Sequence, residues 1–184
     1  MFKKTLIKKT DRKAPCGRKN NAEKNPAKKD AETIYAFKPV GFVRREGASE
    51  SVDWSDLGAT SRIEILPRYA PALDGIEEYS HIIIFFVFHK RKTVKLTQRP
   101  ENKRCNPEVG IFCTNSEKRP NPLGMTVVKL LKAVGNVLTV RGLDALDGTP
   151  VIDIKPYAGF EEEAPEYHIP DWLMKIWERE HSSQ

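Results

Sequence analysis

The sequence predicts a mainly β protein: a small antiparallel β-barrel with a C-terminal helix and a disordered N-terminal tail. Short β-type runs separated by Gly, Pro, Asn and Asp begin at Ile34 and recur at the spacing of an antiparallel sandwich or barrel. One amphipathic helix follows them. The chain shows no series of strands alternating with long helices and no G-x-G-x-x-G motif after a strand, which argues against a dinucleotide-binding domain.

Residues 1–33 are expected to form a basic flexible tail, and residues 34–184 the barrel domain. Residues 1–32 hold 11 of the 31 Lys and Arg residues and 4 of the 25 Asp and Glu residues, which leaves 20 basic and 21 acidic residues elsewhere. A tail of this composition buries too little apolar surface to offset the entropy of ordering. It either gathers RNA phosphates or is an unstructured leader.

The composition favours a cytoplasmic protein without a membrane partner. The longest apolar run, Ile82–Phe88, is about a third of the roughly 20 residues that a membrane-spanning helix needs. The basic N-terminal stretch lacks the apolar centre of a secretory signal, although it is compatible with a transit peptide. Cys16, Cys105 and Cys113 form no C-x-x-C pair.

Seven strands are expected from the apolar runs. Between two of them, Gly135-Asn136 supplies two turn-forming residues and predicts a hairpin. In chain order the expected strands are Ile34–Arg45, Arg62–Leu66, His81–His89, Gly110–Thr114, Met125–Ala133, Val137–Leu143 and Thr149–Ile154.

A helix is expected from Pro170 to about His181. Proline suits a first helical turn, and four apolar side chains lie on one face: Trp172, Leu173, Ile176 and Trp177. This face forms a lid or partner contact, or it packs across the barrel or against a second subunit. The packing interpretation is favoured.

Two loop segments carry the polar groups most suited to binding. In the first, Pro120 and Pro122 make a stiff loop that presents Arg119 and Asn121; it is either a recognition loop or a plain crossover. In the second, the Asp147-Gly148 turn lies within an apolar stretch that also holds Asp144 and Asp153. Buried carboxylates need partners, which Lys155, Arg119 or a cationic ligand could supply.

A third segment starts at the end of the longest apolar run. His81 and His89 lie eight residues apart, without a Cys pair or a third His nearby, so no metal is expected. Seven cations then follow against one acid, Glu101. These cations form either a solvated loop or a patch that contacts RNA phosphates, and the patch is favoured. The seven cations are Lys90, Arg91, Lys92, Lys95, Arg99, Lys103 and Arg104.

Four ordered blocks within residues 34–160 resemble the TsaA-like family, also called the YaeB, VirR or TrmO family. The first is Pro39-Val-Gly41-Phe-Val-Arg44, and the second runs from Tyr79-Ser-His-Ile82 to Phe88-His89. The third is similar to the family's G-V-F-A-T-R-S-P-x-R-P-N-P-I-G-L/M-S loop and spans 110–126. The fourth, 144–157, is similar to D-L-L-D-G-T-P-V-L-D-I-K-P-Y.

The resemblance implies a TsaA-like β-barrel that dimerises and binds S-adenosyl-L-methionine near the subunit interface. It also implies an S-adenosylmethionine-dependent tRNA N-methyltransferase, acting on N6 of threonylcarbamoyl-adenosine beside the anticodon. The residues it implies for cofactor binding are His89, Lys90, Asn115, Ser116, Arg119, Pro120, Asn121, Pro122, Met125, Asp147, Gly148, Thr149, Pro150 and Val151.

The chain departs from the family pattern at three places. Asn115-Ser116-Glu117 stands where the family usually has Arg-Ser-Pro, so a neutral amide replaces a cation, for which Lys118 is a candidate substitute. Arg44-Arg45-Glu46 also replaces Arg-Ser-Pro, which affects any cofactor contact from Asp53 or Trp54. The chain stops soon after its helix, whereas bacterial members often carry a further C-terminal domain.

The mechanistic expectation is an in-line methyl transfer that depends mainly on alignment. Asp147 and His89 are the candidates for a general base. Two alternatives stay open: a methyltransferase of the same fold with another RNA or small-molecule substrate, and a cofactor-binding or RNA-binding module without catalysis.

Overall fold

The computed structural model describes residues 34–45, 58–158 and 169–181 of the 184-residue chain. The chain divides into two compact units, Met1–Ala36 and Phe37–Gln184. Residues 34–36, the described part of the first unit, form neither helix nor strand. The predicted tail, 1–33, and the positions Asp53 and Trp54 lie outside the described residues, so these expectations stay predictions.

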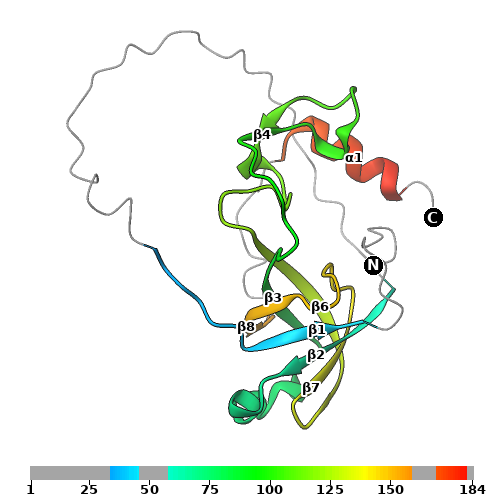
Figure 1. Ribbon diagram of the computed structural model, residues 1–184. Helices are drawn as coiled ribbons and strands as arrows, with labels where there is room; N and C mark the ends of the chain where they lie inside the picture. Colours follow the sequence, from blue (N-terminus) through cyan, green and yellow to red (C-terminus); the bar gives the residue numbers. More distant parts are fainter. Residues whose placement is uncertain (1–33, 46–57, 159–168, 182–184) are drawn as a thin grey trace, which may run out of the picture. The chain divides into compact units, whose positions relative to one another are not determined.

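Six strands of the second unit close into an antiparallel barrel (Figure 1), which confirms the predicted fold class. Their order around the barrel is β1-β2-β7-β6-β3-β8, and β8 pairs back to β1. The strands are β1 Gly41–Arg44, β2 Thr60–Ile65, β3 His81–Val87, β6 Leu123–Val134, β7 Val137–Arg141 and β8 Pro150–Pro156.

Alternating side chains of these strands fill the barrel interior. Ile82, Ile84 and Phe86 of β3 are buried, and the residues between them are partly exposed. This period of two is the signature of a strand with one face inward. The other strands add Val43, Ile63, Ile65, Val128, Leu138, Val140 and Val151 to the same core.

The hairpin predicted at Gly135-Asn136 joins β6 to β7. Gly135 has a φ of 59°, a conformation that glycine adopts without a Cβ penalty. Asn136 then ties the turn to the end of β2: its carbonyl accepts from Ile65 N at 2.8 Å and its Nδ2 donates to Ile65 O at 2.6 Å. The turn between β6 and β7 therefore also holds the end of β2.

A second region lies outside the barrel sheet. Strands β4, Thr97–Gln98, and β5, Val109–Gly110, form a two-stranded sheet, and helix α1 spans Asp171–His181, which confirms the predicted helix. Buried Asn106 organises the loop between β4 and β5 by donating to Pro100 O and to Glu101 Oε2, both at 3.0 Å. Arg179 of α1 donates to the same Glu101 carboxylate at 2.9 Å.

Two of the seven predicted strands are wrong over much of their length, and the other five differ from the observed strands by at most two residues at either end. Residues 34–40 of the expected strand Ile34–Arg45 are not β, since Pro39 lacks an amide donor and Ile34, Tyr35 and Phe37 are exposed. The expected strand Gly110–Thr114 is a 3₁₀ turn after Gly110, because Thr114 N and Oγ1 both donate back to Ile111 O.

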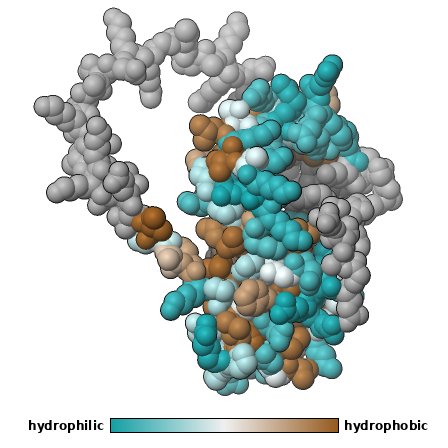
Figure 2. Space-filling view, in the orientation of Figure 1, coloured by the Kyte–Doolittle hydropathy of each residue, from teal (hydrophilic) through white to brown (hydrophobic). Residues whose placement is uncertain are grey.

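Hydrophilic side chains cover most of the face seen in Figure 2, with apolar side chains scattered among them. Three of the exposed apolar side chains, Leu123, Met125 and Val127, follow one another on the outward face of β6. Within the described residues, no helix combines the length and hydropathy needed to cross a bilayer.

Candidate functional site

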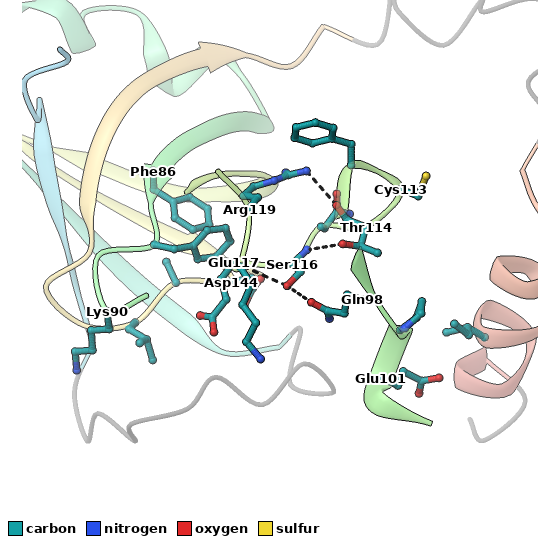
Figure 3. A pocket seen from close by; sticks show the side chains of 18 of the residues that line it. Phe86, Lys90, Gln98, Glu101, Cys113, Thr114, Ser116, Glu117, Arg119 and Asp144 are labelled. Atoms are coloured by element: carbon teal, nitrogen blue, oxygen red, sulfur yellow. Dashed lines mark hydrogen bonds between the residues drawn. The ribbon is translucent and has the colours of Figure 1, made fainter. Parts of the chain in front are cut away.

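An open pocket of about 1210 Å³ collects residues from four separate parts of the second unit. They come from the end of β3 and the residues after it, from the loop 112–119, from the segment 144–149 and from α1 (Figure 3). Gln98, Pro100 and Glu101 complete the lining. Residues 112–119, which precede the Pro-Asn-Pro segment, and residues 144–146 and 149, around the Asp-Gly turn, thus line one cavity although they are far apart in the sequence.

Hydrogen bonds within loop 114–119 give it a fixed shape. Arg119 Nη2 donates to Thr114 O at 3.1 Å, which closes the loop on itself. Ser116 Oγ donates to Gln98 Oε1 at 2.6 Å and accepts from Lys118 N at 3.3 Å. Since the loop is held before any ligand arrives, binding costs less conformational entropy.

Arg91, which does not line the pocket, holds the start of the Pro-Asn-Pro segment by hydrogen bonds. Its Nη1 donates to Arg119 O at 2.6 Å and to Pro120 O at 3.3 Å. Phe88 N also donates to Pro122 O at 2.8 Å. These bonds attach the loop to the segment that leaves β3, and proline fixes φ at two positions within it.

The Asp-Gly turn is attached to the end of β1 by one side-chain and one backbone hydrogen bond. Asp147 Oδ1 accepts from Arg45 N at 2.9 Å, and Gly148 N donates to Val43 O at 2.9 Å. Gly148 has a φ of 72°, in the left-handed region that favours glycine. The turn thereby places Thr149, whose side chain is buried, against the pocket.

Two ionisable groups of the pocket have shifted pKa values. Burial, followed by Lys90, lowers the pKa of His89, while Asp147 opposes that shift. His89 Nδ1 lies 3.3 Å from Thr149 Oγ1, and this contact holds the imidazole in place. Burial raises the pKa of the Asp144 carboxyl to about 6, with Arg45 lowering it and Glu117 raising it.

A family model described as the tRNA-methyltransferase O N-terminal domain matches residues 53–161, which include both loops of the pocket. The chain belongs to this family. That confirms the resemblance found in the sequence and, at the level of the family, the prediction of a tRNA methyltransferase that uses S-adenosyl-L-methionine.

Relatives and solved structures agree with the family. A probable S-adenosyl-L-methionine-binding protein of Pyrococcus abyssi is 40% identical over 156 residues, covering 77% of this chain and 78% of that protein. The tRNA (adenine(37)-N6)-methyltransferase of Escherichia coli is 40% identical over 116 residues, covering 59% of this chain and 49% of that enzyme.

Among solved structures, a crystal structure of TrmO matches with a TM-score of 0.58 and 30% identity, covering 74% of this chain and 64% of that one. The chain thus spans about half of the E. coli enzyme and less than two thirds of this solved structure.

Six of the fourteen residues expected at the cofactor line the pocket, and they come from all three predicted segments: His89, Lys90, Asn115, Ser116, Arg119 and Thr149. The structure does not bring the other eight into its lining. Met125 is exposed on β6, and Val151 is buried in the barrel core. The other six lie in or beside the two loops. The carbonyls of Pro120, Asn121 and Pro122 accept hydrogen bonds, Asp147 and Gly148 bond to Arg45 N and Val43 O, and Pro150 pairs with Phe42 of β1.

The sequence reasoning missed the apolar wall of the pocket and one of its carboxylates. Phe86, Phe88 and Phe112 line the cavity, with Trp172, Leu173 and Ile176 of α1. Helical periodicity predicts that the α1 residues share one face, and the favoured interpretation packs this face across the barrel or on a second subunit, whereas in the structure these residues line the pocket. Asp144 had been noted only as a buried carboxylate in need of partners.

The expected absence of a metal rests on sequence spacing. His81, on β3, lies 3.0 Å from Ser80 Oγ through its Nδ1 and packs edge-on against Tyr157. His89 lies beyond the end of β3, so the two rings do not share a strand face. In the part of the chain that the structure describes, no three His, Cys, Asp or Glu side chains are grouped as metal ligands.

Proposed function

We propose that this protein transfers a methyl group from S-adenosyl-L-methionine to N6 of threonylcarbamoyl-adenosine, next to the tRNA anticodon. The observation that carries the proposal is the shared pocket: loop 114–119 and segment 144–149 line it together with His89. Both segments belong to the region matched by the tRNA-methyltransferase O N-terminal domain. The E. coli relative is named for methylation of adenine 37 at N6.

The residues of the pocket suit this cofactor. Half-buried Phe88 offers an aromatic face for a purine ring, and half-buried Asp144 offers a negative charge for a cationic sulfonium. Asn115, Ser116 and Arg119 provide amide, hydroxyl and guanidinium groups for ribose and carboxylate oxygens. When bound, the cofactor supplies an activated methyl group, and the residues of the chain supply alignment.

The tRNA would approach over the basic segment 90–104. Arg91, Arg99 and Lys103 are engaged with other groups of the protein. Lys92, Lys95 and Arg104 are exposed, and each can pair with a phosphate. An anticodon loop is single-stranded, so its bases can enter the pocket and stack on aromatic rings. Phe112, 78% exposed on the pocket wall, offers such a ring.

A homodimer and a cytoplasmic location are part of the same proposal. The outward apolar side chains of β6, Leu123, Met125 and Val127, support the homodimer because large exposed apolar groups in a row favour an interface. Light scattering of the purified protein measures its mass in solution directly. A mass of one chain across the concentrations used would contradict the dimer.

The decisive experiment uses tRNA from a strain that lacks this methyltransferase activity. The protein is incubated with that tRNA and methyl-labelled S-adenosyl-L-methionine, and the nucleosides are separated by mass spectrometry. We expect the label on threonylcarbamoyl-adenosine. Label on another nucleoside would indicate a different RNA substrate, which the Asn115 and Glu117 departures favour; cofactor binding without any labelled RNA would indicate a non-catalytic module.

A further inference from the structure

Two aspartates of segment 144–149 have different roles in the structure. Asp147 Oδ1 accepts the Arg45 N–H bond that holds the turn to β1, and Asp147 does not line the pocket. Asp144 lines the pocket and is half-buried. Figure 3 shows Asp144 beside Glu117, which belongs to the opposite loop. The carboxylate that this segment presents to a ligand is therefore that of Asp144.

Charged groups act on Asp144 from two directions. Arg45, after β1, donates through Nη1 to the neighbouring Ala145 O at 3.5 Å and attracts the carboxylate. Glu117 repels it from loop 114–119. The other charged or titratable residues of the pocket are His89, Lys90, Glu101, Cys113, Lys118 and Arg119.

Methylation of an N6 nitrogen that still carries hydrogen requires a proton acceptor. The lone pair of such a nitrogen is delocalised into the purine, and in threonylcarbamoyl-adenosine also into a carbonyl group, so the neutral nitrogen is a weak nucleophile. Loss of its proton restores the electron pair and leaves a neutral product. An acceptor works best when its pKa lies near the operating pH.

Asp144 and His89 both line the pocket, and the geometry favours Asp144 as the acceptor. Burial raises the pKa of Asp144 to about 6, which makes its carboxylate a stronger base than an exposed aspartate and leaves it ionised at pH 7 to 8. Burial lowers the pKa of His89, which makes its imidazole a weaker base than usual, and its Nδ1 already faces Thr149 Oγ1.

We propose that Asp144 accepts the N6 proton during methyl transfer and that Glu117 modulates its basicity. The inference rests on the proposed function. N6 forms a bond to the methyl carbon as the carbon–sulfur bond breaks, and the electron pair of that bond stays on sulfur. The N6 proton passes to a carboxylate oxygen of Asp144 and then to water. Glu117 stands where the family pattern has proline, so this control of Asp144 is a property of this chain.

The test compares Asp144→Asn with the wild type and with Asp74→Asn, a matched change of an exposed aspartate outside the pocket. Single-turnover methylation of hypomodified tRNA is measured from pH 5 to pH 9, with cofactor affinity by calorimetry and folding by circular dichroism. For Asp144→Asn we expect a fall of about 100-fold or more in rate, on the scale of a lost general base. Because Asp144 also faces the cationic sulfonium in the proposed site, cofactor affinity should fall as well, so the rate is measured at saturating cofactor. Asp74→Asn should match the wild type in both rate and affinity.

Glu117→Gln provides a second, independent measurement. Removing the neighbouring negative charge should lower the pKa of Asp144, so the acidic limb of the pH–rate profile should move to lower pH. Carbon-13 NMR titration of the Asp144 carboxyl in the protein without ligand should show the same displacement, which requires no turnover. The NMR measurement separates an effect on the carboxyl from an effect on tRNA binding.

The outcomes distinguish this inference from the proposed function. If the wild type methylates the tRNA and Asp144→Asn does so at the same rate with the same pH profile, Asp144 is not the proton acceptor. The same conclusion follows if Glu117→Gln displaces neither the profile nor the NMR titration. If the wild type transfers no methyl to any tRNA, it is the proposed function that fails.

Discussion

Single side chains shape the pocket by bonding to the backbone of its loops. Asp147 holds the Asp-Gly turn through Arg45 N, and Thr114 Oγ1 turns the chain after β5 through Ile111 O at 2.9 Å. A carboxylate used in this way accepts a charge-assisted hydrogen bond and is less available to a ligand. Residues with similar chemistry in the sequence therefore divide into those that build the site and those that face it.

Gly124 of β6 shows how closely the barrel interior is packed. A Cβ at this position would lie 2.4 Å from both Cε2 and Cζ of Phe86. We expect Gly124→Ala to lower the free energy of unfolding by about 1–3 kcal/mol, as overpacked cores do. Urea denaturation measures the change. Gly110→Ala is the control, since no other group lies within 4 Å of the place that its Cβ would occupy, and an equal loss in both variants would contradict a packing cause.

Asp144 makes stability depend on pH in a defined direction. Its pKa is raised from 3.8 to about 6 in the folded protein, so folding is favoured while the group is protonated, and this contribution is lost as the pH rises through about 6. Asp144→Asn should therefore gain stability relative to the wild type at pH 7.5 but not at about pH 4. With solvent screening of a half-buried group, the gain is on the order of 1 kcal/mol.

Urea denaturation of wild type and Asp144→Asn at both pH values checks this expectation. A stability difference that does not vary with pH would mean that the Asp144 carboxyl titrates alike in the folded and unfolded states.

At the scale of elements, the pocket depends on segments that the barrel strands place side by side. β3 leads into His89, and its neighbour β6 follows directly from the Pro-Asn-Pro loop. β8 follows from the Asp-Gly turn and pairs with both β3 and β1. The strand order therefore gathers three loops at one place, although they are far apart in the chain, as Thr149 and His89 illustrate with a separation of 60.

Arg91 provides a test of how much the attachment of the loop contributes. It donates to two carbonyls of the Arg119-Pro120 backbone and does not line the pocket. A hydrogen bond from a charged donor stabilises by roughly 1.5–3 kcal/mol when its loss leaves the acceptor unpaired. Here water can bond to the Arg119 and Pro120 carbonyls in place of Arg91, so the loss is smaller. We expect Arg91→Ala to weaken cofactor binding about 5- to 30-fold in calorimetry.

Lys92→Ala is the matched control for Arg91, because it removes the charge of an exposed neighbour. An equal loss of cofactor affinity in both variants would show that net charge, not the attachment of the loop, sets the effect.

At the scale of the whole molecule, the proposed contact with tRNA depends on where the positive charge lies. Net charge is +6 for the chain, but the cations of segment 90–104 are concentrated beside the pocket. Such a cluster attracts phosphates without reading the sequence of the RNA. A salt-dependent affinity for tRNA follows from this arrangement.

The triple variant Lys92→Ala, Lys95→Ala, Arg104→Ala tests the basic segment. Each lost phosphate contact lowers the slope of log affinity against log salt by about 0.7–0.9, so the variant should lose roughly 2–3. Filter binding of tRNA at several salt concentrations measures the slope. The control removes three exposed lysines elsewhere, Lys38, Lys129 and Lys132. Equal slopes for the triple variant and the wild type would exclude the segment from the RNA interface.

The sequence by itself determined the barrel strands, the hairpin at Gly135-Asn136 and helix α1, because alternation, turn residues and helical periodicity are local properties. Its ordered motifs also determined the family. Only the tertiary structure decided that Asp144 faces the pocket while Asp147 supports it, and that Trp172, Leu173 and Ile176 line the same cavity. These outcomes depend on contacts such as Arg45 to Asp147, 102 residues apart, which no local pattern encodes.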